Sequence, residues 1–185
     1  MSSSLHFPNG YAQLVARLRV PGGFLLVLAF GWLARPSVLS MEIGLPIAVA
    51  GLLLRAWAAG HLEKNTRLAT SGPYAWVRNP LYLGTLLTAC GLVAASRRPV
   101  LAVLFALVFG LVYLPAIQLE EEYLQKLFPD FTEYASRVHA LWPQRPAHPA
   151  NAHFRADLYV RNEEYQALFG FLAGAAWLVV KLIWF

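Results

Sequence analysis

The stretch "PVLAVLFALVFGLVYLPAIQL", residues 99–119, is 21 residues long and contains no charged side chain. About 20 apolar residues are enough for an α-helix to cross the hydrocarbon core of a membrane. The stretch therefore predicts a membrane-spanning helix, and the rest of the fold has to be built around it.

The composition of the whole chain agrees with a membrane protein. Of its 185 residues, 58% are hydrophobic and 14% are charged, and the mean hydropathy is +0.49. A soluble domain typically has about 25% charged residues, because polar side chains must cover its surface. The net charge of +5 comes without a basic stripe. It therefore favours the lipid bilayer as a partner and excludes nucleic acid.

Weaker apolar segments flank the central one, at residues 20–34, 43–60, 80–96 and 165–185. Together they predict an all-α, polytopic integral membrane protein with about five transmembrane helices and a cytoplasmic helical extension. Arg55 and Lys181 lie near the ends of two segments. Their long side chains are expected to reach the lipid headgroups.

The placement of lysine and arginine predicts the orientation, because these residues are enriched in cytoplasmic loops. With a cytoplasmic N-terminus, only Arg35, Arg97 and Arg98 lie clearly outside. The residues that then lie inside are Arg17, Arg19, Lys64, Arg67, Arg78, Lys126, Arg137, Arg145, Arg155 and Arg161. We therefore expect the N-terminus in the cytoplasm.

The polar residues fall into two cytoplasmic segments, 61–79 and 120–164. Only "SRRP" joins the third and fourth spans, so these spans are expected to form a tight hairpin whose open end brings the two polar segments together. In the second segment a helix should break near Pro129. Asp130 or Thr132 is then expected to cap a short helix, and Asn162 to begin the last span.

The stretch "LATSGPYAWVRNPLYLG", residues 68–84, lies between the second and third spans. Each of its features has a simple structural explanation. Asn79 would cap a helix beginning at Pro80, Tyr82 would join an aromatic belt, and Arg78 would face lipid phosphates. Together they also suit a binding site, because a helix N-terminus beside an arginine attracts an anionic group.

Three consecutive glutamates end the fourth span. Glu122 precedes Lys126 by four residues, which predicts a solvated ion pair on the helix surface. Glu120 shares a helix face with apolar residues, where a carboxylate at the membrane boundary is costly without a partner. We therefore predict that Glu120 is functional, and Glu121 suits either role.

These stretches resemble the isoprenylcysteine carboxyl methyltransferase family of integral membrane enzymes and the related phospholipid methyltransferases. The family pattern looks like G-x-Y-x-x-x-R-[HN]-P-x-Y-x-G, followed by E-E-x-x-L-x-x-x-F. The matching residues are Gly72, Tyr74, Arg78, Asn79, Pro80, Tyr82, Gly84, Glu120, Glu121, Leu124 and Phe128. The likeness covers residues 55–142 of a single domain, 1–185, and leaves 143–185 as a linker and the last span. It looks like a bacterial-type homologue of the inner (plasma) membrane.

The resemblance implies a methyltransferase that uses S-adenosyl-L-methionine, releases S-adenosyl-L-homocysteine and needs no metal. The acceptor would be lipophilic or lipidated, with a carboxylate, thiol or amine at the cytoplasmic face. The implied cofactor contacts are His61, Thr66, Arg67, Leu68, Ala69, Tyr74, Asn79, Pro80, Leu81, Tyr82 and Glu120. The implied catalytic residues are Arg78, Asn79, Tyr82 and Glu121, with Glu121 as the base for an amine acceptor.

Two positions depart from the family pattern. Asn79 stands where many members have histidine, and asparagine cannot act as a general base. Ala116 stands where the prenylcysteine enzymes have an arginine for the substrate carboxylate, which argues against a prenylcysteine acceptor. Two other functions stay open: an NADPH-dependent membrane reductase of sterol-like substrates, and a non-enzymatic membrane scaffold. The reductase would need more basic residues for phosphates than "RLATSGPYAWVR" supplies.

Overall fold

The computed structural model of the protein describes residues 7–146 and 153–184, without the side chains of residues 9, 12, 13 and 16–21. Arg17 and Arg19, which contributed to the predicted orientation, are among those undescribed side chains. All regular elements in the described ranges are helical. The all-α prediction is therefore confirmed.

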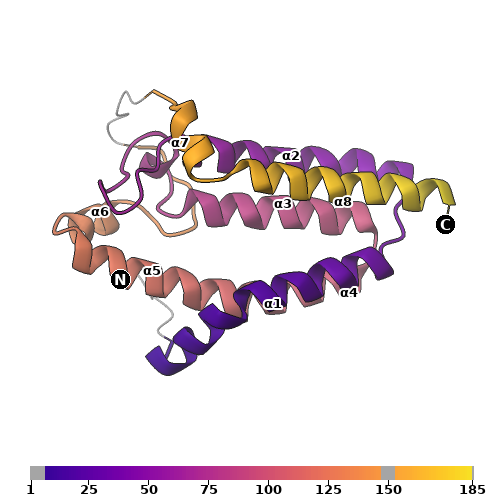
Figure 1. Cartoon of the computed structure of the whole chain (residues 1–185), viewed down its shortest axis with the longest axis horizontal. Helices are drawn as coiled ribbons and strands as arrows, with labels where there is room; N and C mark the ends of the chain where they lie inside the picture. Colours follow the sequence, from indigo (N-terminus) through magenta and orange to yellow (C-terminus); the bar gives the residue numbers. More distant parts are fainter. Residues whose placement is uncertain (1–6, 147–152, 185) are drawn as a thin grey trace.

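Five helical rods and several short helices make up the chain (Figure 1). The rods are α1 (Asn9–Leu33), α2 (Val38–Ala59), α3 (Pro80–Ser96), the continuous helix formed by α4 (Pro99–Val108), η2 (Phe109–Tyr113) and α5 (Leu114–Leu127), and α8 (Tyr165–Trp184). The short helices are η1 (Gly72–Ala75), α6 (Phe131–Arg137) and α7 (Ala156–Arg161). Here η1 is a 3₁₀-helix and η2 is a single π-helical turn.

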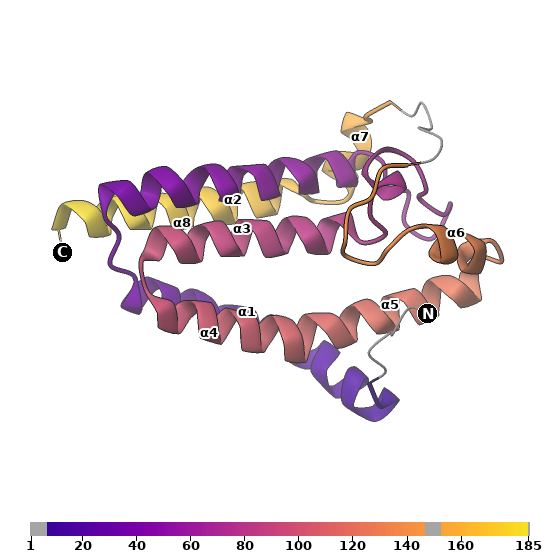
Figure 2. The same cartoon turned by 180° about the vertical axis from the view of Figure 1, so that it is seen from behind.

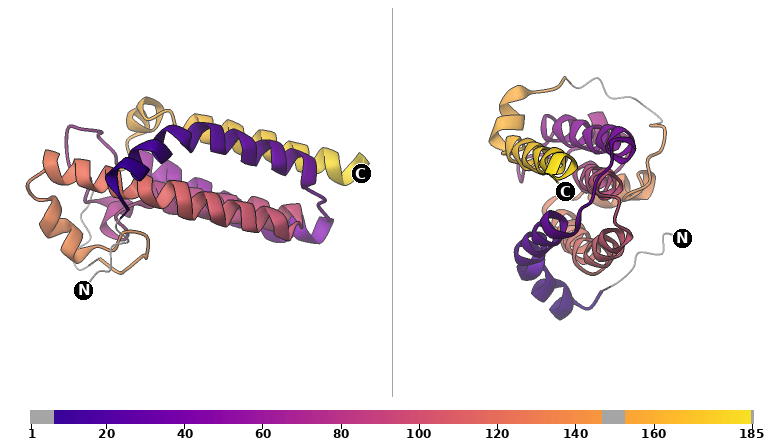
Figure 3. Two further views of the ribbon diagram at one scale, coloured as in Figure 1. Left: turned by 90° about the horizontal axis from the view of Figure 1, so that it is seen from below. Right: turned by 90° about the vertical axis from the view of Figure 1, so that its right-hand side faces the viewer.

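The rods form two layers that run along the long axis of the molecule. Helices α2, α3 and α8 lie together in one layer, and α1 lies beside the α4–α5 rod in the other (Figures 1 and 2). An end-on view separates the same two groups (Figure 3). We call the end that carries α6, α7 and the loop after α2 the loop end, and the end with the short connections at residues 34–37 and 97–98 the hairpin end.

Helices α2 and α3 pack along a seam of small residues. A Cβ atom added at Gly51 would lie 2.6 Å from the carbonyl oxygen of Gly84. One added at Gly91 would lie 2.5 Å from the carbonyl oxygen of Gly44. Real Cβ atoms do not approach backbone so closely, so the two helix axes can come this near only because these positions are glycine. The seam therefore sets the distance between α2 and α3, the two helices from which the loop end begins.

Three rods are long and apolar enough to cross a membrane: Val38–Ala59, Pro99–Leu127 and Tyr165–Trp184. The apolar part of α1, Gly22–Leu33, and helix α3 are shorter. Helix α3 has 17 residues, which is near the lower limit of about 17–25 for a spanning helix. In the described residues, the predicted apolar segments thus lie in helices apart from Ala34 and Gly60 at two helix ends, and the count of five spans stays a prediction.

At the hairpin end, side chains from other elements cap the last carbonyls of α1. Lys181 Nζ donates to the Trp32 carbonyl at 2.7 Å, Trp177 Nε1 to Gly31 at 2.9 Å, and Arg98 Nε to Leu33 at 3.0 Å. The Lys181 ammonium thus binds the negative end of the α1 dipole, and its reach to the headgroups stays a prediction. The two bonds from α8 join the two layers at the hairpin end, and the Arg98 bond links α1 to the start of α4 in its own layer.

Candidate active site

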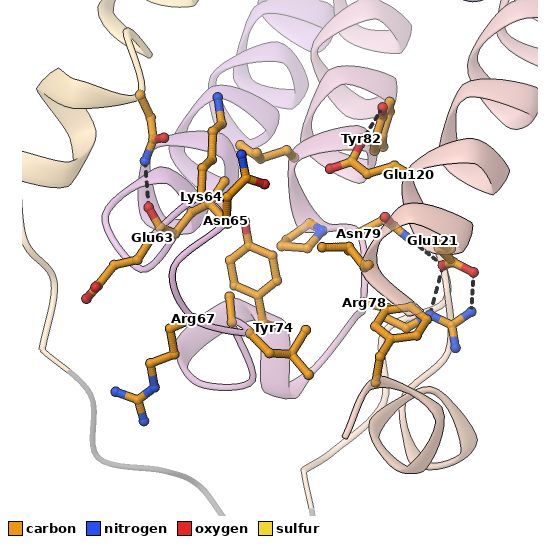
Figure 4. A pocket seen from close by; sticks show the side chains of 18 of the residues that line it. Glu63, Lys64, Asn65, Arg67, Tyr74, Arg78, Asn79, Tyr82, Glu120 and Glu121 are labelled. Atoms are coloured by element: carbon orange, nitrogen blue, oxygen red, sulfur yellow. Dashed lines mark hydrogen bonds and ion pairs between the residues drawn. The ribbon is translucent and has the colours of Figure 1, made fainter. Parts of the chain in front are cut away.

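A cavity of about 360 Å³ opens at the loop end, between the last turn of α2, the start of α3, α5 and α6 (Figure 4). Most of the predicted site residues line it: Arg67, Leu68, Ala69, Tyr74, Arg78, Asn79, Pro80, Leu81, Tyr82, Glu120 and Glu121. The two polar segments of the sequence therefore meet, as expected from the hairpin.

Two predicted site residues lie outside this cavity. His61 lines a neighbouring cavity of about 410 Å³, and its Nδ1 lies 2.9 Å from the Trp57 carbonyl oxygen. Thr66 is exposed, and its hydroxyl donates to the Lys64 carbonyl at 3.2 Å. Between these two residues lies Asn65, which has a positive φ of 60° and itself lines the main cavity.

Tyr82 and Glu120 meet across the cavity, from the first turn of α3 and from α5. The Tyr82 hydroxyl donates to Glu120 Oε2 at 2.8 Å (Figure 4). Tyr113 packs edge-on against the Tyr82 ring at 6.3 Å between centroids. Tyr113 ends the π-helical turn η2, and such turns re-aim the residues that follow them in a helix. The partner that the sequence requires for Glu120 is therefore Tyr82.

Arg78 and Glu121 form a two-point ion pair beside the cavity. Arg78 Nε and Nη2 donate to the two carboxylate oxygens of Glu121 at 2.8 and 3.0 Å. Asn79 Nδ2 adds a third bond to Glu121 Oε1 at 2.8 Å. Asn79 occupies the N-cap position of α3 as predicted, but its side chain makes no cap bond, because it serves Glu121 instead.

The segment after α5 closes over the residues before α3. Arg78 Nη1 donates to the Ala135 carbonyl at 2.8 Å, and its guanidinium lies 5.9 Å from the Phe131 ring centre. The backbone amides of Arg78 and Asn79 donate to the carbonyls of His139 and Ala140 at 2.8 and 3.0 Å. Arg78 is therefore bound to protein groups and does not face lipid phosphates.

Tyr74 stands in the middle of the cavity (Figure 4). Its side chain is buried, and its hydroxyl has no hydrogen-bond partner among the described residues. Burial and the nearby Glu120 carboxylate raise the pKa of Tyr74 above its usual value of 10. The hydroxyl therefore stays protonated, and a buried unpaired hydroxyl is a group that a ligand can satisfy.

Tyr134 on α6 holds the backbone of Tyr74 in place. Its hydroxyl donates to the Tyr74 carbonyl at 2.7 Å. Burial raises the pKa of Tyr134, while Arg78 acts in the opposite direction. Phe131, Tyr134 and Val138 form a buried apolar cluster at α6. Helix α6 begins after Asp130, but that side chain makes no cap bond.

Two site residues were missed in the sequence. Arg55 forms a two-point ion pair with Glu164, with Nε 2.5 Å from Oε1 and Nη2 2.9 Å from Oε2, and both side chains line the cavity. The expectation that Arg55 reaches the headgroups is therefore wrong, because a carboxylate lies within the protein. An arginine inside an apolar helix was the available signal.

Two smaller expectations are also corrected. Asn162 does not begin the last span: it follows α7, and its Nδ2 donates to the carbonyls of Ala59 and Leu62 at 3.0 and 2.9 Å. Glu122 accepts a hydrogen bond from Gln118 Nε2 at 2.7 Å, and no ion pair joins it to Lys126 in the described structure. Asn162 is thus held by carbonyls about 100 residues away in the sequence, whereas Glu122, among the described residues, binds the residue one turn before it and not the one a turn after it.

The layers and the cavity define a class of protein: an all-helical membrane protein with a polar, aromatic-walled pocket at one end of its bundle. The family model for phospholipid methyltransferases matches residues 26–130. The chain belongs to this family.

Several curated proteins are similar to parts of the chain. The cobalt-zinc-cadmium resistance protein CzcN of Cupriavidus metallidurans is 38% identical over 55% of this chain and 47% of its own length. Protein-S-isoprenylcysteine O-methyltransferase B of Arabidopsis thaliana is 34% identical over 52% of this chain and 56% of its own. Protein-S-isoprenylcysteine O-methyltransferase of Schizosaccharomyces pombe is 27% identical over 70% of this chain and 57% of its own length.

The chain spans about half the length of the curated relatives it matches. No solved structure matches it significantly.

Proposed function

We propose that the protein is an S-adenosyl-L-methionine-dependent methyltransferase that acts on a lipophilic, membrane-resident acceptor at the cytoplasmic face of a bacterial plasma membrane. The observation that carries this is the composition of one cavity. It combines the N-terminus of α3, the Tyr82–Glu120 pair and the unpaired hydroxyl of Tyr74. Membership of the phospholipid methyltransferase family favours this function over an NADPH-dependent reductase or a scaffold.

The donor set of the cavity fits the cofactor. The first turn of α3 presents backbone N–H groups that no residue within the helix can accept, and these suit the methionyl carboxylate. Glu120 would accept from the amino group or from the ribose hydroxyls. The ring faces of Tyr74 and Tyr82 would stabilise the sulfonium cation. Leu68 would contribute to an apolar slot for adenine.

When bound, the cofactor supplies a methyl group that is already activated for displacement. The protein therefore contributes mainly by alignment, and holding two reactants in line can supply about 7–11 kcal/mol of the barrier. Arg78, Asn79 and Glu121 brace the entry to α3, and we assign them a positioning role. Tyr82 and Glu120 would hold the groups next to the reacting centre.

The same contacts favour one chemical class of acceptor over another. A carboxylate or a thiolate is a nucleophile without losing a further proton, whereas an amine acceptor needs a base. Glu121 was the predicted base, but its oxygens already accept three N–H groups. Because these donors engage both of its oxygens, Glu121 is poorly placed to take a proton from a substrate, and this proposal favours an acceptor that reaches the cavity already deprotonated.

The first test is calorimetric titration of the detergent-purified protein with S-adenosyl-L-homocysteine. We expect micromolar binding, and we expect Glu120→Ala to weaken it at least tenfold, which corresponds to about 1.4 kcal/mol. Glu122→Ala is the matched control, because Glu122 lies on the same helix but outside the cavity lining. Absence of binding to folded protein would rule out the proposed function, and NADPH would be titrated next.

A further inference from the structure

The Arg55–Glu164 pair joins residues 109 positions apart in the sequence. Glu164 is 6% exposed and Arg55 is 22% exposed. Glu164 directly precedes α8, and it follows Glu163, whose backbone is in the left-handed conformation at φ 57°. The last helix therefore begins with a buried carboxylate whose orientation is fixed at two points by α2.

The remaining edge of the Arg55 guanidinium, at Nη1, points toward α3. Its Nη1 donates to the Leu81 carbonyl at 3.3 Å and to the Thr85 hydroxyl, which in turn donates to the same carbonyl at 2.9 Å. Leu81 belongs to the run of α3 that we assign to the cofactor. Arg55 thus connects Glu164 to the backbone of the first turn of α3.

The pair faces the same cavity as the unsatisfied hydroxyl of Tyr74. Arg55, Glu164 and Thr85 all line that cavity. The groups whose charges act on Tyr74 include Glu120, Glu164 and Arg55. A ligand that satisfied the buried hydroxyl would therefore share the cavity with Arg55, Glu164 and Thr85.

Docking α8 does not by itself require an ion pair. Leu178 on the same helix is fully buried in an apolar cluster with Ala34, Met41 and Ala95. Burying a charged pair costs desolvation energy that apolar side chains of similar volume do not incur. An ion pair at the membrane boundary that also faces a cavity points to a role in the site.

We propose that Glu164 and Arg55 are positioning residues of the cofactor site, and that the start of α8 is thereby part of the catalytic unit. Glu164 fixes the guanidinium of Arg55, and Arg55 fixes the first turn of α3 through the Leu81 carbonyl. This inference rests on the proposed function, because the ligand it positions is the cofactor.

The test compares the affinity for S-adenosyl-L-homocysteine with the thermal midpoint of the same protein in detergent. The double variant Arg55→Met, Glu164→Met removes both charges and keeps similar volume, so the bundle should still fold. We expect its affinity to fall at least tenfold while its midpoint stays near that of the wild type. Glu164→Gln keeps the shape and should lose less affinity than Glu164→Ala.

Two control variants separate positioning from simple stability. Trp177→Phe removes the bond between α8 and the Gly31 carbonyl at the hairpin end, so it should lower the midpoint and leave the affinity unchanged. Glu163→Gln changes the exposed neighbour of Glu164 and should affect neither quantity.

The outcomes distinguish this inference from the function on which it rests. If the wild type binds S-adenosyl-L-homocysteine and the double methionine variant binds it equally well, the positioning role is wrong and the proposed function stands. If the folded wild type does not bind, the proposed function fails and the positioning role fails with it.

Discussion

Arg78 makes more bonds to the rest of the site than its position in a loop suggests. Its guanidinium binds Glu121 on α5 at two points and the Ala135 carbonyl on α6. Lysine carries the same charge but has one donor nitrogen and cannot span these groups. We therefore expect Arg78→Lys to cost about 2–3 kcal/mol, because the partly buried Glu121 loses a two-point partner.

That cost would appear as a fall of about 5–10 °C in the thermal midpoint in detergent, at about 2–4 °C for each kcal/mol in a chain of this size. Arg137→Lys is the matched control, because Arg137 pairs with Glu133 on the surface and both are largely exposed, at 68% and 73%. Its midpoint should stay within about 1 °C of the wild type. Equal shifts for the two variants would contradict the bracing role of Arg78.

Tyr74→Phe should separate stability from ligand binding. Removing a buried, unpaired hydroxyl should stabilise the protein by about 1 kcal/mol. The same change should weaken binding of S-adenosyl-L-homocysteine, because the ligand loses a donor in the cavity. Tyr165→Phe, on the exposed face of α8 and outside the cavity lining, is the control and should change neither quantity. A variant that is less stable would show that the hydroxyl has a partner in the apo protein.

The raised pKa of Tyr74 also predicts a dependence of stability on pH. Below pH 10 the hydroxyl is protonated in both the folded and the unfolded chain. Above pH 10 the unfolded chain releases the proton while the folded chain keeps it, so the folded state loses up to about 1.4 kcal/mol for each pH unit. The midpoint of Tyr74→Phe should therefore exceed that of the wild type by more at pH 11 than at pH 8.

For single residues, the sequence could predict a functional side chain where both it and its hydrogen-bond partner lie in recognisable motifs. Glu120 was singled out because a carboxylate on an apolar face needs a partner, and the structure supplies Tyr82. The partner of Arg55 could not be found in the same way, because Glu164 is 109 residues away and looks like an ordinary helix-start carboxylate. Pairings of that kind depend on how helices are arranged, which local patterns do not determine.

Among the elements, the contact between α2 and α3 is the one that depends most on residue size. A Cβ atom at Gly91 would meet the amide nitrogen of Ala48 and lie 2.8 Å from its Cα. Backbone atoms cannot move aside as a side chain can, so Gly91→Ala should push the two helices apart. We expect a cost of about 1–3 kcal/mol, despite the higher helix propensity of alanine.

Gly174→Ala in α8 is the matched control, since nothing lies within 4 Å of a Cβ atom added there. It should be neutral or slightly stabilising, because alanine favours the helix. Thermal midpoints of both variants in detergent provide the measurement. If Gly91→Ala were as stable as Gly174→Ala, the seam could not be closely packed.

The helices themselves were largely predictable, whereas their irregular parts were not. Residues 80–96 were predicted as a span and form α3, because proline at a helix start and an apolar run are local signals. The π-helical turn at Phe109–Tyr113 lies inside an unbroken apolar run and has no such signal. It is recognised from its backbone, where the Leu114 amide donates to the Phe109 carbonyl five residues before it.

For the molecule as a whole, the length of the α4–α5 rod explains how a membrane protein presents a polar site. The rod has 29 residues and is therefore about 43 Å long. The hydrocarbon core measures about 30 Å, so roughly one third of the rod must project beyond it. If the hairpin end lies at one boundary, the projecting part is the one that carries Glu120 and Glu121.

The number of membrane spans determines whether Arg35 and Glu133 lie on the same side of the membrane or on opposite sides. With five spans, Arg35, between α1 and α2, and Glu133, on α6, lie on opposite sides of the membrane. If only the three long rods crossed, α1 and α3 would not, and both positions would lie on the same side. The shortness of the apolar part of α1 is what makes this alternative worth testing.

We expect opposite sides, with Glu133 in the cytoplasm. In a Cys90→Ser background, Arg35→Cys should react with a membrane-impermeant maleimide in intact cells, and Glu133→Cys only after lysis. Both positions are exposed, so lack of reaction would not reflect burial. The background variant alone should remain unlabelled. Labelling of both cysteines from the same side would overturn the five-span arrangement, and labelling of Glu133→Cys alone in intact cells would reverse the orientation.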